Sequence, residues 1–325
     1  MSGFCTVYYA FSTKNGVFTK PAKSYWFHGG PMKRKTVKSL KMLEAFTGYG
    51  FVLPDFLGLL VFLIIPAFLG LYLGLYEWPG VGSMHYVGLE NFRKMVEDPL
   101  FLKSLTTTFK LIALFVPLNF FLSLSLALLV QRSSKSVGLF RTIYFAPVAI
   151  SAVSVGLIWK FMCQPKGIIN ALLISMGMRP QPLLGSTSQA FYVLLSTLLY
   201  QSAGYYMVIF IAGLNDIPQE LYEAAKVDGA TWLQRLRFVT LPLLKPVSFF
   251  VFIMSLLGAF QTFDQIQILT GGGPFYATTT TVFYAYLMAF QFYRFGYASA
   301  INFIIFILQL LISLIMFKVM RGGKV

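Results

Sequence analysis

E-L-Y-E-A-A-K-V-D-G-A-T-W-L-Q-R-L-R-F-V-T-L-P-L-L-K-P, from Glu220 to Pro246, is the longest polar, charge-rich interval between two apolar spans of this 325-residue sequence. Glu, Ala and Lys favour a helix over 220–228, and Gly229 supplies a sharp turn after it. Thr231 is placed to cap a second helix, over 232–237. The interval is therefore predicted to fold as a helical hairpin.

The hairpin combines a charged side with an apolar side. Its charged residues are Glu220, Glu223, Lys226, Asp228, Arg235 and Arg237, and its apolar residues include Leu221, Tyr222, Ala225, Trp232, Leu233 and Leu236. The charges make it too polar for the lipid interior, whereas the apolar side needs to be covered. Such a hairpin is expected to bind another protein, and an interfacial hairpin without a partner is the alternative.

The spacing of this interval resembles the EAA loop of ABC importer permeases. Glu223-Ala224-Ala225 is followed by Gly229 and then by Leu241-Pro242, with Val239 in place of the commoner Ile. In that family the loop is a cytoplasmic coupling helix that docks in a groove of an ATP-hydrolysing subunit. The resemblance implies an ATPase-coupling role for Glu220, Glu223, Ala224, Ala225, Asp228, Gly229, Leu241 and Pro242.

The composition indicates an integral membrane protein. The chain is 57% hydrophobic and only 11% charged, with a mean hydropathy of +0.71, whereas soluble domains carry about 25% charged residues. The net charge of +15 comes from Lys and Arg that flank apolar spans, so it reflects topology rather than nucleic-acid binding. Two Cys and two His are too few to predict a disulfide framework or a metal site.

Six spans are each long enough to cross the hydrocarbon layer, which predicts an all-α, polytopic fold of the type I ABC importer permease kind. They are placed at 51–76, 109–130, 142–161, 190–214, 246–269 and 295–317. Eighteen Lys and Arg residues lie on the side of both termini and of the hairpin, against eight on the other side. Both termini are therefore expected in the cytoplasm of a bacterial cell, beneath its inner membrane. The uncharged run 275–293 is assigned to an outer helix or loop rather than to a seventh span, because its threonines and tyrosines suit an interface.

The domain prediction follows from these spans. Residues 1–50 form a cytoplasmic leader and basic segment, 51–102 the first transmembrane helix and an external loop, 103–321 the importer transmembrane domain with its coupling loop at 215–245, and 322–325 a tail. The basic segment is interpreted either as a short helix on the inner membrane surface or as a disordered tail. Met1 and Met32 both remain candidate starts.

A second group of motifs resembles the carbohydrate-uptake, maltose-transporter branch of these permeases. It comprises Phe263-Asp264-x-Ile266-x-x-Leu269-Thr270-Gly271-Gly272-Gly273-Pro274, Gly204-Tyr205 with Met207, and Phe295-Gly296-Tyr297-Ala298-x-Ala300. The resemblance implies a carbohydrate cargo, a second homologous permease, two ATPase subunits and an extracytoplasmic solute-binding protein. No G-x-x-x-x-G-K-[ST] sequence occurs, so the chain is expected to be no enzyme and to bind no cofactor, with ATP and Mg²⁺ on the ATPase.

The predicted substrate path combines neutral hydrogen-bonding groups with aromatic faces, as sugar sites commonly do. It comprises Gln201, Gly204, Tyr205, Gln261, Thr262 and Asp264. Asp264 is interpreted either as a polar wall of the path or as a structural carboxylate that caps the Gly-rich turn or pairs with a neighbouring subunit's base. An ion-coupled secondary transporter and a non-sugar ABC permease are the alternative functions.

Cations on the external side bear on the charge of the cargo. Lys160, Lys166, Arg179 and Arg294 have no acidic residue within their own external loops. Their field is expected to concentrate anions, which favours an oligosaccharide that contains uronate. Pairing with lipid phosphates, or with acids of a partner protein, is the alternative.

Overall fold

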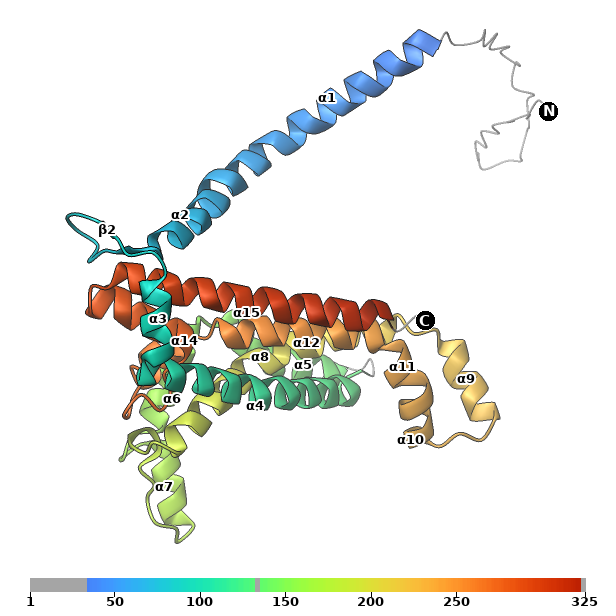
Figure 1. Ribbon diagram of the computed structural model, residues 1–325. Coiled ribbons are helices and arrows are strands. Elements are labelled where there is room, and N and C mark those ends of the chain that lie inside the picture. Colours follow the sequence, from blue (N-terminus) through green and yellow to red (C-terminus); the bar gives the residue numbers. More distant parts are fainter. Residues whose placement is uncertain (1–33, 132–134, 323–325) are drawn as a thin grey trace, which may run out of the picture. The chain divides into compact units, whose positions relative to one another are not determined.

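The computed structural model describes residues 34–131 and 135–322, and these are mainly helical (Figure 1). The chain divides into two compact units, 1–65 and 66–325. In the first unit α1 (Arg34–Leu59) continues into a π-helix, η1 (Leu60–Ile64). The predictions for the leader 1–31 and for Met32 lie outside the described residues. From Arg34 the basic segment is helical and leads directly into the first apolar stretch.

The second unit holds the remaining elements. Its first half comprises α2 (Ile65–Leu73), β1 (Tyr76–Glu77), β2 (His85–Tyr86), α3 (Glu90–Glu97), α4 (Pro99–Leu129), α5 (Lys135–Ala149), α6 (Ala152–Met162), α7 (Ile168–Ser175) and a 3₁₀ turn, η2 (Leu183–Gly185). Its second half comprises α8 (Gln189–Asn215), α9 (Gln219–Val227), α10 (Trp232–Arg235), η3 (Leu236–Thr240), α11 (Leu241–Leu243), α12 (Lys245–Phe260), α13 (Asp264–Leu269), α14 (Thr281–Tyr286), η4 (Leu287–Gln291) and α15 (Phe295–Gly322). The two strands pair antiparallel, with Tyr76 opposite Tyr86.

The apolar helices agree with the predicted spans in part. Four stretches of the described residues are long and apolar enough to cross a membrane: Glu44–Leu73, Pro99–Leu129, Gln189–Asn215 and Phe295–Lys318. Two bent pairs bring the number to six if each pair is one span. The total of six and the cytoplasmic termini therefore stay predictions, while a multi-helix membrane fold is what the described residues show.

Two predicted spans are interrupted. Within 142–161 the chain bends by 99° between α5 and α6, where Ser151 begins a new helix and its hydroxyl accepts from the Ser154 N–H at 3.2 Å. Pro147, near the end of α5, removes a helical donor just before that bend. The predicted span 246–269 ends as a helix at Phe260, because Gln261 to Phe263 leave the helical path before α13.

The run 275–293 forms α14 and η4, and neither is among the candidate spans. Its position differs from the expected outer surface, because Thr278 to Thr281 are almost completely buried. The Thr280 hydroxyl donates to the Thr262 carbonyl at 3.1 Å, and the Thr281 N–H donates to the Thr108 hydroxyl at 2.9 Å. These threonines therefore tie the turn before α14 to α4 and to the end of α12.

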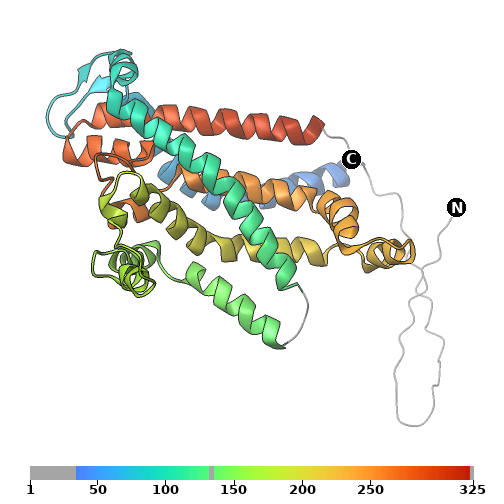
Figure 2. The ribbon, with the colours of Figure 1, turned by 90° about the horizontal axis from the view of Figure 1, so that it is seen from below.

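The core of the second unit lies between α4, α8, α12, α14 and α15, which pack side by side (Figures 1 and 2). Leu111, Leu194 and Phe283 centre one apolar cluster, and Phe210 and Leu244 centre the other. Small residues allow close approach: a Cβ at Gly74 would lie 3.3 Å from the Ala300 backbone of α15. By contrast, no atom outside its own helix backbone lies within 4 Å of a Cβ built at Gly70.

Asp98 joins three elements at one end of this bundle. Its carboxylate caps α4 by accepting from the N–H groups of Leu100 and Phe101, at 2.9 and 3.3 Å. It also accepts from the hydroxyls of Tyr284 and Tyr297, at 2.6 and 2.7 Å. Burial by itself would raise the pKa of Asp98, but these hydrogen bonds outweigh it and hold the pKa below its ordinary value.

Asp98→Asn is expected to destabilise the fold at neutral pH by about 1–2 kcal/mol, since it removes charge-assisted hydrogen bonds from a partly exposed group. A lowered folded-state pKa contributes stability that is present above the ordinary Asp pKa and is lost as pH falls through the folded value. Thermal unfolding of the purified protein should thus show a gap between the two proteins that is full at pH 7 and closes only in acid. Equal stability at pH 7 would contradict the role given to Asp98.

Candidate functional site

A polar cleft of about 210 Å³ opens between α4, α8 and the segment that joins α12 to α13. It is lined by Phe115, Leu198, Gln201, Ser202, Tyr206, Gly258, Gln261, Thr262, Phe263, Asp264 and Gln265. Four of the six predicted path residues are thus brought together: Gln201, Gln261, Thr262 and Asp264. The interruption of the predicted fifth span creates this cleft, because it turns the residues after Phe260 toward α8.

Gln201 connects the two sides of the polar cleft. Its amide oxygen accepts from the Gln265 amide of α13 at 2.7 Å. Its amide nitrogen donates to the Ile150 carbonyl at 3.4 Å, at the bend between α5 and α6. Neutral amides in this arrangement can exchange their mutual bonds for bonds to sugar hydroxyls.

The neighbouring wall is held by a buried polar chain. The Ser202 hydroxyl of α8 donates to the Asn119 oxygen of α4 at 3.0 Å, and the Asn119 amide donates to the Ser255 hydroxyl of α12 at 3.0 Å. Asn119 and Ser255 are fully buried. Because buried polar groups are costly unless paired, this chain fixes the three helices relative to one another.

Asp264 is exposed in the first turn of α13, where the helix dipole favours a carboxylate. In the described part of the chain it makes no ion pair or side-chain hydrogen bond. The Gly-rich turn is held by threonines instead, with the Thr279 hydroxyl donating to the Gly272 carbonyl and the Thr278 hydroxyl to the Gly273 carbonyl. Two interpretations of Asp264 therefore remain: its carboxylate forms part of the cleft wall, or it forms an ion pair with a basic residue of a neighbouring subunit.

The remaining predicted path residues lie differently. Thr262 lines the cleft but is only 5% exposed, and its hydroxyl donates to the Gly258 carbonyl. Gly204 is a packing position, because a Cβ there would collide with the Tyr144 carbonyl oxygen of α5. Tyr205 is exposed on α8 and does not line this cleft.

Tyr206 lines the cleft, in agreement with its prediction as an aromatic group for sugar binding, whereas sequence reasoning missed the polar lining residues Ser202 and Gln265. A signal for Ser202 exists, since it lies next to Gln201 and one turn before Tyr206 on α8. Gln265 carries no comparable signal. Gln265 reaches Gln201 because the chain changes direction between the end of α12 and the start of α13.

The coupling hairpin, residues 219–243, has the predicted turn and cap. Gly229 takes φ +76°, which favours glycine, and Thr231 with Gln234 forms a capping box. The Tyr222 and Thr240 hydroxyls are hydrogen-bonded at 3.0 Å, which joins the two arms. Figure 1 shows α9 and α10 beyond the end of α12, at the same end of the bundle as the C-terminal end of α15.

The hairpin presents its predicted residues to the outside. Of the eight coupling residues, Ala225 is half-buried and the other seven are exposed. Val227, at the tip, is 88% exposed, and Trp232, Leu233 and Phe238 are also largely exposed. The second arm runs further than predicted: a π-turn and α11 continue it to Leu243, so Pro242 lies inside the arm and the 69° bend falls between Leu243 and Lys245.

Long apolar helices, a polar cleft and an exposed hairpin are features of membrane transporter subunits. The chain belongs to the family described as "Binding-protein-dependent transport system inner membrane component", which matches residues 121–321. This match confirms the resemblance to ABC importer permeases that the Glu220–Pro246 interval indicates.

Full-length relatives support the same family. The chain is 34% identical to "Probable ABC transporter permease protein YurN" of Bacillus subtilis, over 85% of this chain and 96% of that protein. It is 33% identical to "Trehalose/maltose transport system permease protein MalF" of Thermococcus litoralis, over 89% of this chain and 99% of that protein. The crystal structure of a bacterial ABC transporter involved in import of the acidic polysaccharide alginate aligns with a TM-score of 0.79 at 23% identity, covering 90% of this chain and all of that one. That likeness establishes the type I permease fold.

Proposed function

We propose that this chain forms half of a path through which an ABC importer carries an oligosaccharide or related carbohydrate across the bacterial inner membrane. The observation that carries the proposal is the polar cleft, whose Gln201–Gln265 amide pair sits in the same bundle that ends in the coupling hairpin. Neutral amides beside aromatic faces suit a carbohydrate. The trehalose and maltose cargo in the name of the Thermococcus relative supports the same class.

The partners follow from the family. A second homologous permease would complete the path, and the binding protein in the family's description would deliver the cargo from outside. Two ATPase subunits, which bind ATP and Mg²⁺, would dock on Glu223, Gly229 and the exposed apolar tip of the hairpin. This chain would then form part of the translocation path and couple its conformation to the ATPase, where ATP is hydrolysed.

Two other functions stay as alternatives. An ion-coupled transporter would place an acidic group in the path, and Asp264 is the acidic residue that lines the cleft. A permease for another solute class would share the fold and the hairpin. Inhibition of uptake by vanadate would support the ABC importer over the ion-coupled transporter. Competition of saccharides with the transported solute would support a carbohydrate cargo over another solute class.

Gln261→Cys should react with a small water-soluble thiol reagent in a cysteine-free background, and saccharide should protect it. Gln261 is exposed and lines the polar cleft. Leu311→Cys is the matched control, since Leu311 is 50% exposed but lies on the apolar helix α15. Thr262→Cys should react more slowly than Gln261→Cys because of its burial. Equal labelling at 261 and 311, without protection, would exclude the cleft as the path.

The cations favour an anionic cargo. Lys160, Lys166 and Arg179 are exposed, and none of them forms an ion pair among the described residues. Unpaired cations raise the local concentration of anions, and the gain falls with added salt. A uronate-containing oligosaccharide is therefore the proposed cargo.

A further inference from the structure

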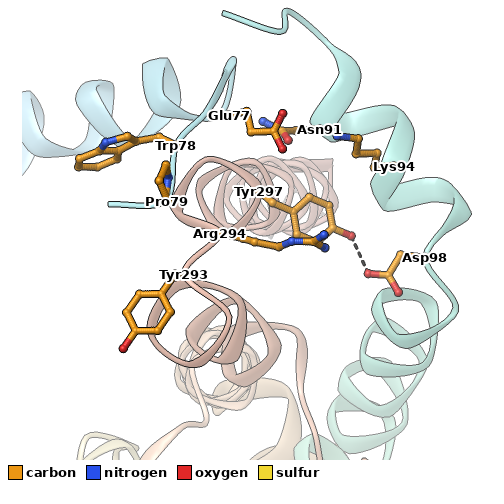
Figure 3. A pocket seen from close by; sticks show the side chains of 9 residues that line it. All are labelled: Glu77, Trp78, Pro79, Asn91, Lys94, Asp98, Tyr293, Arg294 and Tyr297. Carbon is orange, nitrogen blue, oxygen red and sulfur yellow. Dashed lines mark hydrogen bonds between the residues drawn. The ribbon is translucent and has the colours of Figure 1, made fainter. Parts of the chain in front are cut away.

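A cavity larger than the polar cleft lies at the opposite end of the bundle from the hairpin. It has a volume of about 420 Å³ and forms where β1, α3, the start of α4 and the start of α15 meet (Figure 3). It shares no lining residue with the polar cleft. Its volume falls in the range of pockets that bind small molecules.

The walls of this outer pocket are fixed before any ligand arrives. The Asn91 amide donates to the carbonyls of Gly74 and Tyr76, at 3.0 and 2.9 Å. The Phe295 N–H donates to the Trp78 carbonyl at 3.0 Å. Fixed walls lower the ordering cost of binding.

Two cations, Lys94 and Arg294, and two carboxylates, Glu77 and Asp98, line the outer pocket. Lys94 and Arg294 form no ion pair in residues 34–131 and 135–322, where Arg93 with Glu90 is the pair present. Asp98 also lines the pocket, but its two oxygens already accept four hydrogen bonds. The Arg294 guanidinium, which Figure 3 shows beside Tyr297, is therefore free to bind an anionic group.

Trp78 supplies an aromatic wall to the same pocket. The ring packs against Phe295, with centroids 5.6 Å apart, so it is held in place. Its indole Nε1 has no hydrogen-bond partner among the described residues, and because this atom is buried a ligand in the pocket does not reach it.

We propose that the outer pocket binds one uronate unit of an anionic saccharide. Arg294 and Lys94 bind the carboxylate, Trp78 offers an aromatic face, and the free Glu77 carboxylate accepts from sugar hydroxyls. The inference rests on the proposed carbohydrate cargo and adds a holding site outside the polar cleft.

Equilibrium binding of radiolabelled digalacturonate tests the site, with the complete permease–ATPase assembly in nanodiscs and the binding protein left out. Arg294→Gln and Lys94→Gln should each weaken binding about tenfold, because each removes a charge-assisted contact. Arg93→Gln is the matched control: it removes a cation of the same helix that does not line the pocket, and it should leave binding unchanged. Trp78→Ala removes the aromatic face and should weaken binding about threefold.

The dimethyl ester of the same disaccharide keeps the shape and removes the charge. It should bind more weakly than the acid and should not respond to Arg294→Gln. The proposal is overturned if ester and acid bind alike, if Arg93→Gln matches Arg294→Gln, or if Arg294→Gln impairs docking of the binding protein while leaving digalacturonate bound.

ATP-driven uptake of a saccharide panel, measured in parallel, separates this proposal from the proposed function. If saccharides are taken up but Arg294→Gln and Lys94→Gln bind digalacturonate as the parent does, the uronate site in the outer pocket is rejected and the proposed function stands. Absence of uptake for every saccharide overturns the carbohydrate function itself. If Arg294→Gln prevents assembly of the permease with the ATPase, digalacturonate binding to Lys94→Gln still tests the proposal, because Lys94 is exposed on a helix and its replacement should not disturb folding.

Discussion

Gly229→Val is expected to reduce ATP-driven uptake about a hundredfold or more through backbone strain in the hairpin, without preventing insertion of the chain in the membrane. Gly229 holds φ +76° at the turn of the coupling hairpin, a conformation that a β-branched residue adopts only with strain. No atom lies within 4 Å of a Cβ built there, so the effect arises from the backbone and not from a clash. Reorienting α9 relative to α10 displaces the surface proposed to dock on the ATPase.

Gly229→Asn is the matched control, because Asn tolerates left-handed backbone better than other residues. It should retain most of the uptake and of the ATPase that co-purifies. Glu223→Lys should reduce ATPase co-purification by reversing an exposed charge without altering the turn. Full co-purification and uptake in both Gly229→Val and Glu223→Lys would reject the coupling role of the hairpin.

Gly204→Ala is expected to lower the free energy of unfolding by about 3 kcal/mol, at the upper end of overpacking effects. The added methyl group collides with the Tyr144 carbonyl oxygen, and a backbone atom cannot rotate away as a side chain does. Helices α5 and α8 must therefore separate. Thermal unfolding and the yield of folded protein in detergent are the measurements.

Gly258→Ala is the corresponding control, since it makes the same change in a helix with no atom within 4 Å of the new Cβ. Its unfolding temperature should stay near that of the parent. If the two variants prove equally stable, the close contact between α5 and α8 does not hold in the membrane. A change in transport in Gly258→Ala alone would instead report on the polar cleft, which Gly258 lines.

Local signals were sufficient for the hairpin. The left-handed turn at Gly229 and the cap at Thr231 depend on residues within a few positions of one another. The long apolar helices were also predictable, because hydrophobic length is read directly from the sequence. The family was evident for the same reason: its motifs are short and contiguous.

Long-range contacts account for what was missed. The 99° bend after Pro147 cannot be recognised from hydropathy, because the residues around it are mainly apolar. The polar residues Gln261, Thr262 and Asp264 do follow the end of α12 at Phe260, but the apolar residues beyond them led to a continuous predicted span. Burial of Thr278 to Thr281 depends on partners such as Thr108, more than a hundred positions away. Gly204 was recognised in the sequence only as part of the Gly204-Tyr205 motif. The structure explains why glycine is needed there, because a Cβ would collide with the Tyr144 carbonyl oxygen.

The bend at Ile150 has a consequence for how long a sugar stays bound. The Ile150 carbonyl accepts from the Gln201 amide at an exposed position. A sugar hydroxyl that captures this amide exchanges one hydrogen bond for another, while water satisfies the carbonyl. The net gain of such an exchange is at most about 0.5–1.5 kcal/mol, and each 1.4 kcal/mol changes the dissociation constant about tenfold. A carrier must release its cargo on every cycle, and exchanges of this size hold a sugar weakly enough for release to keep pace with turnover.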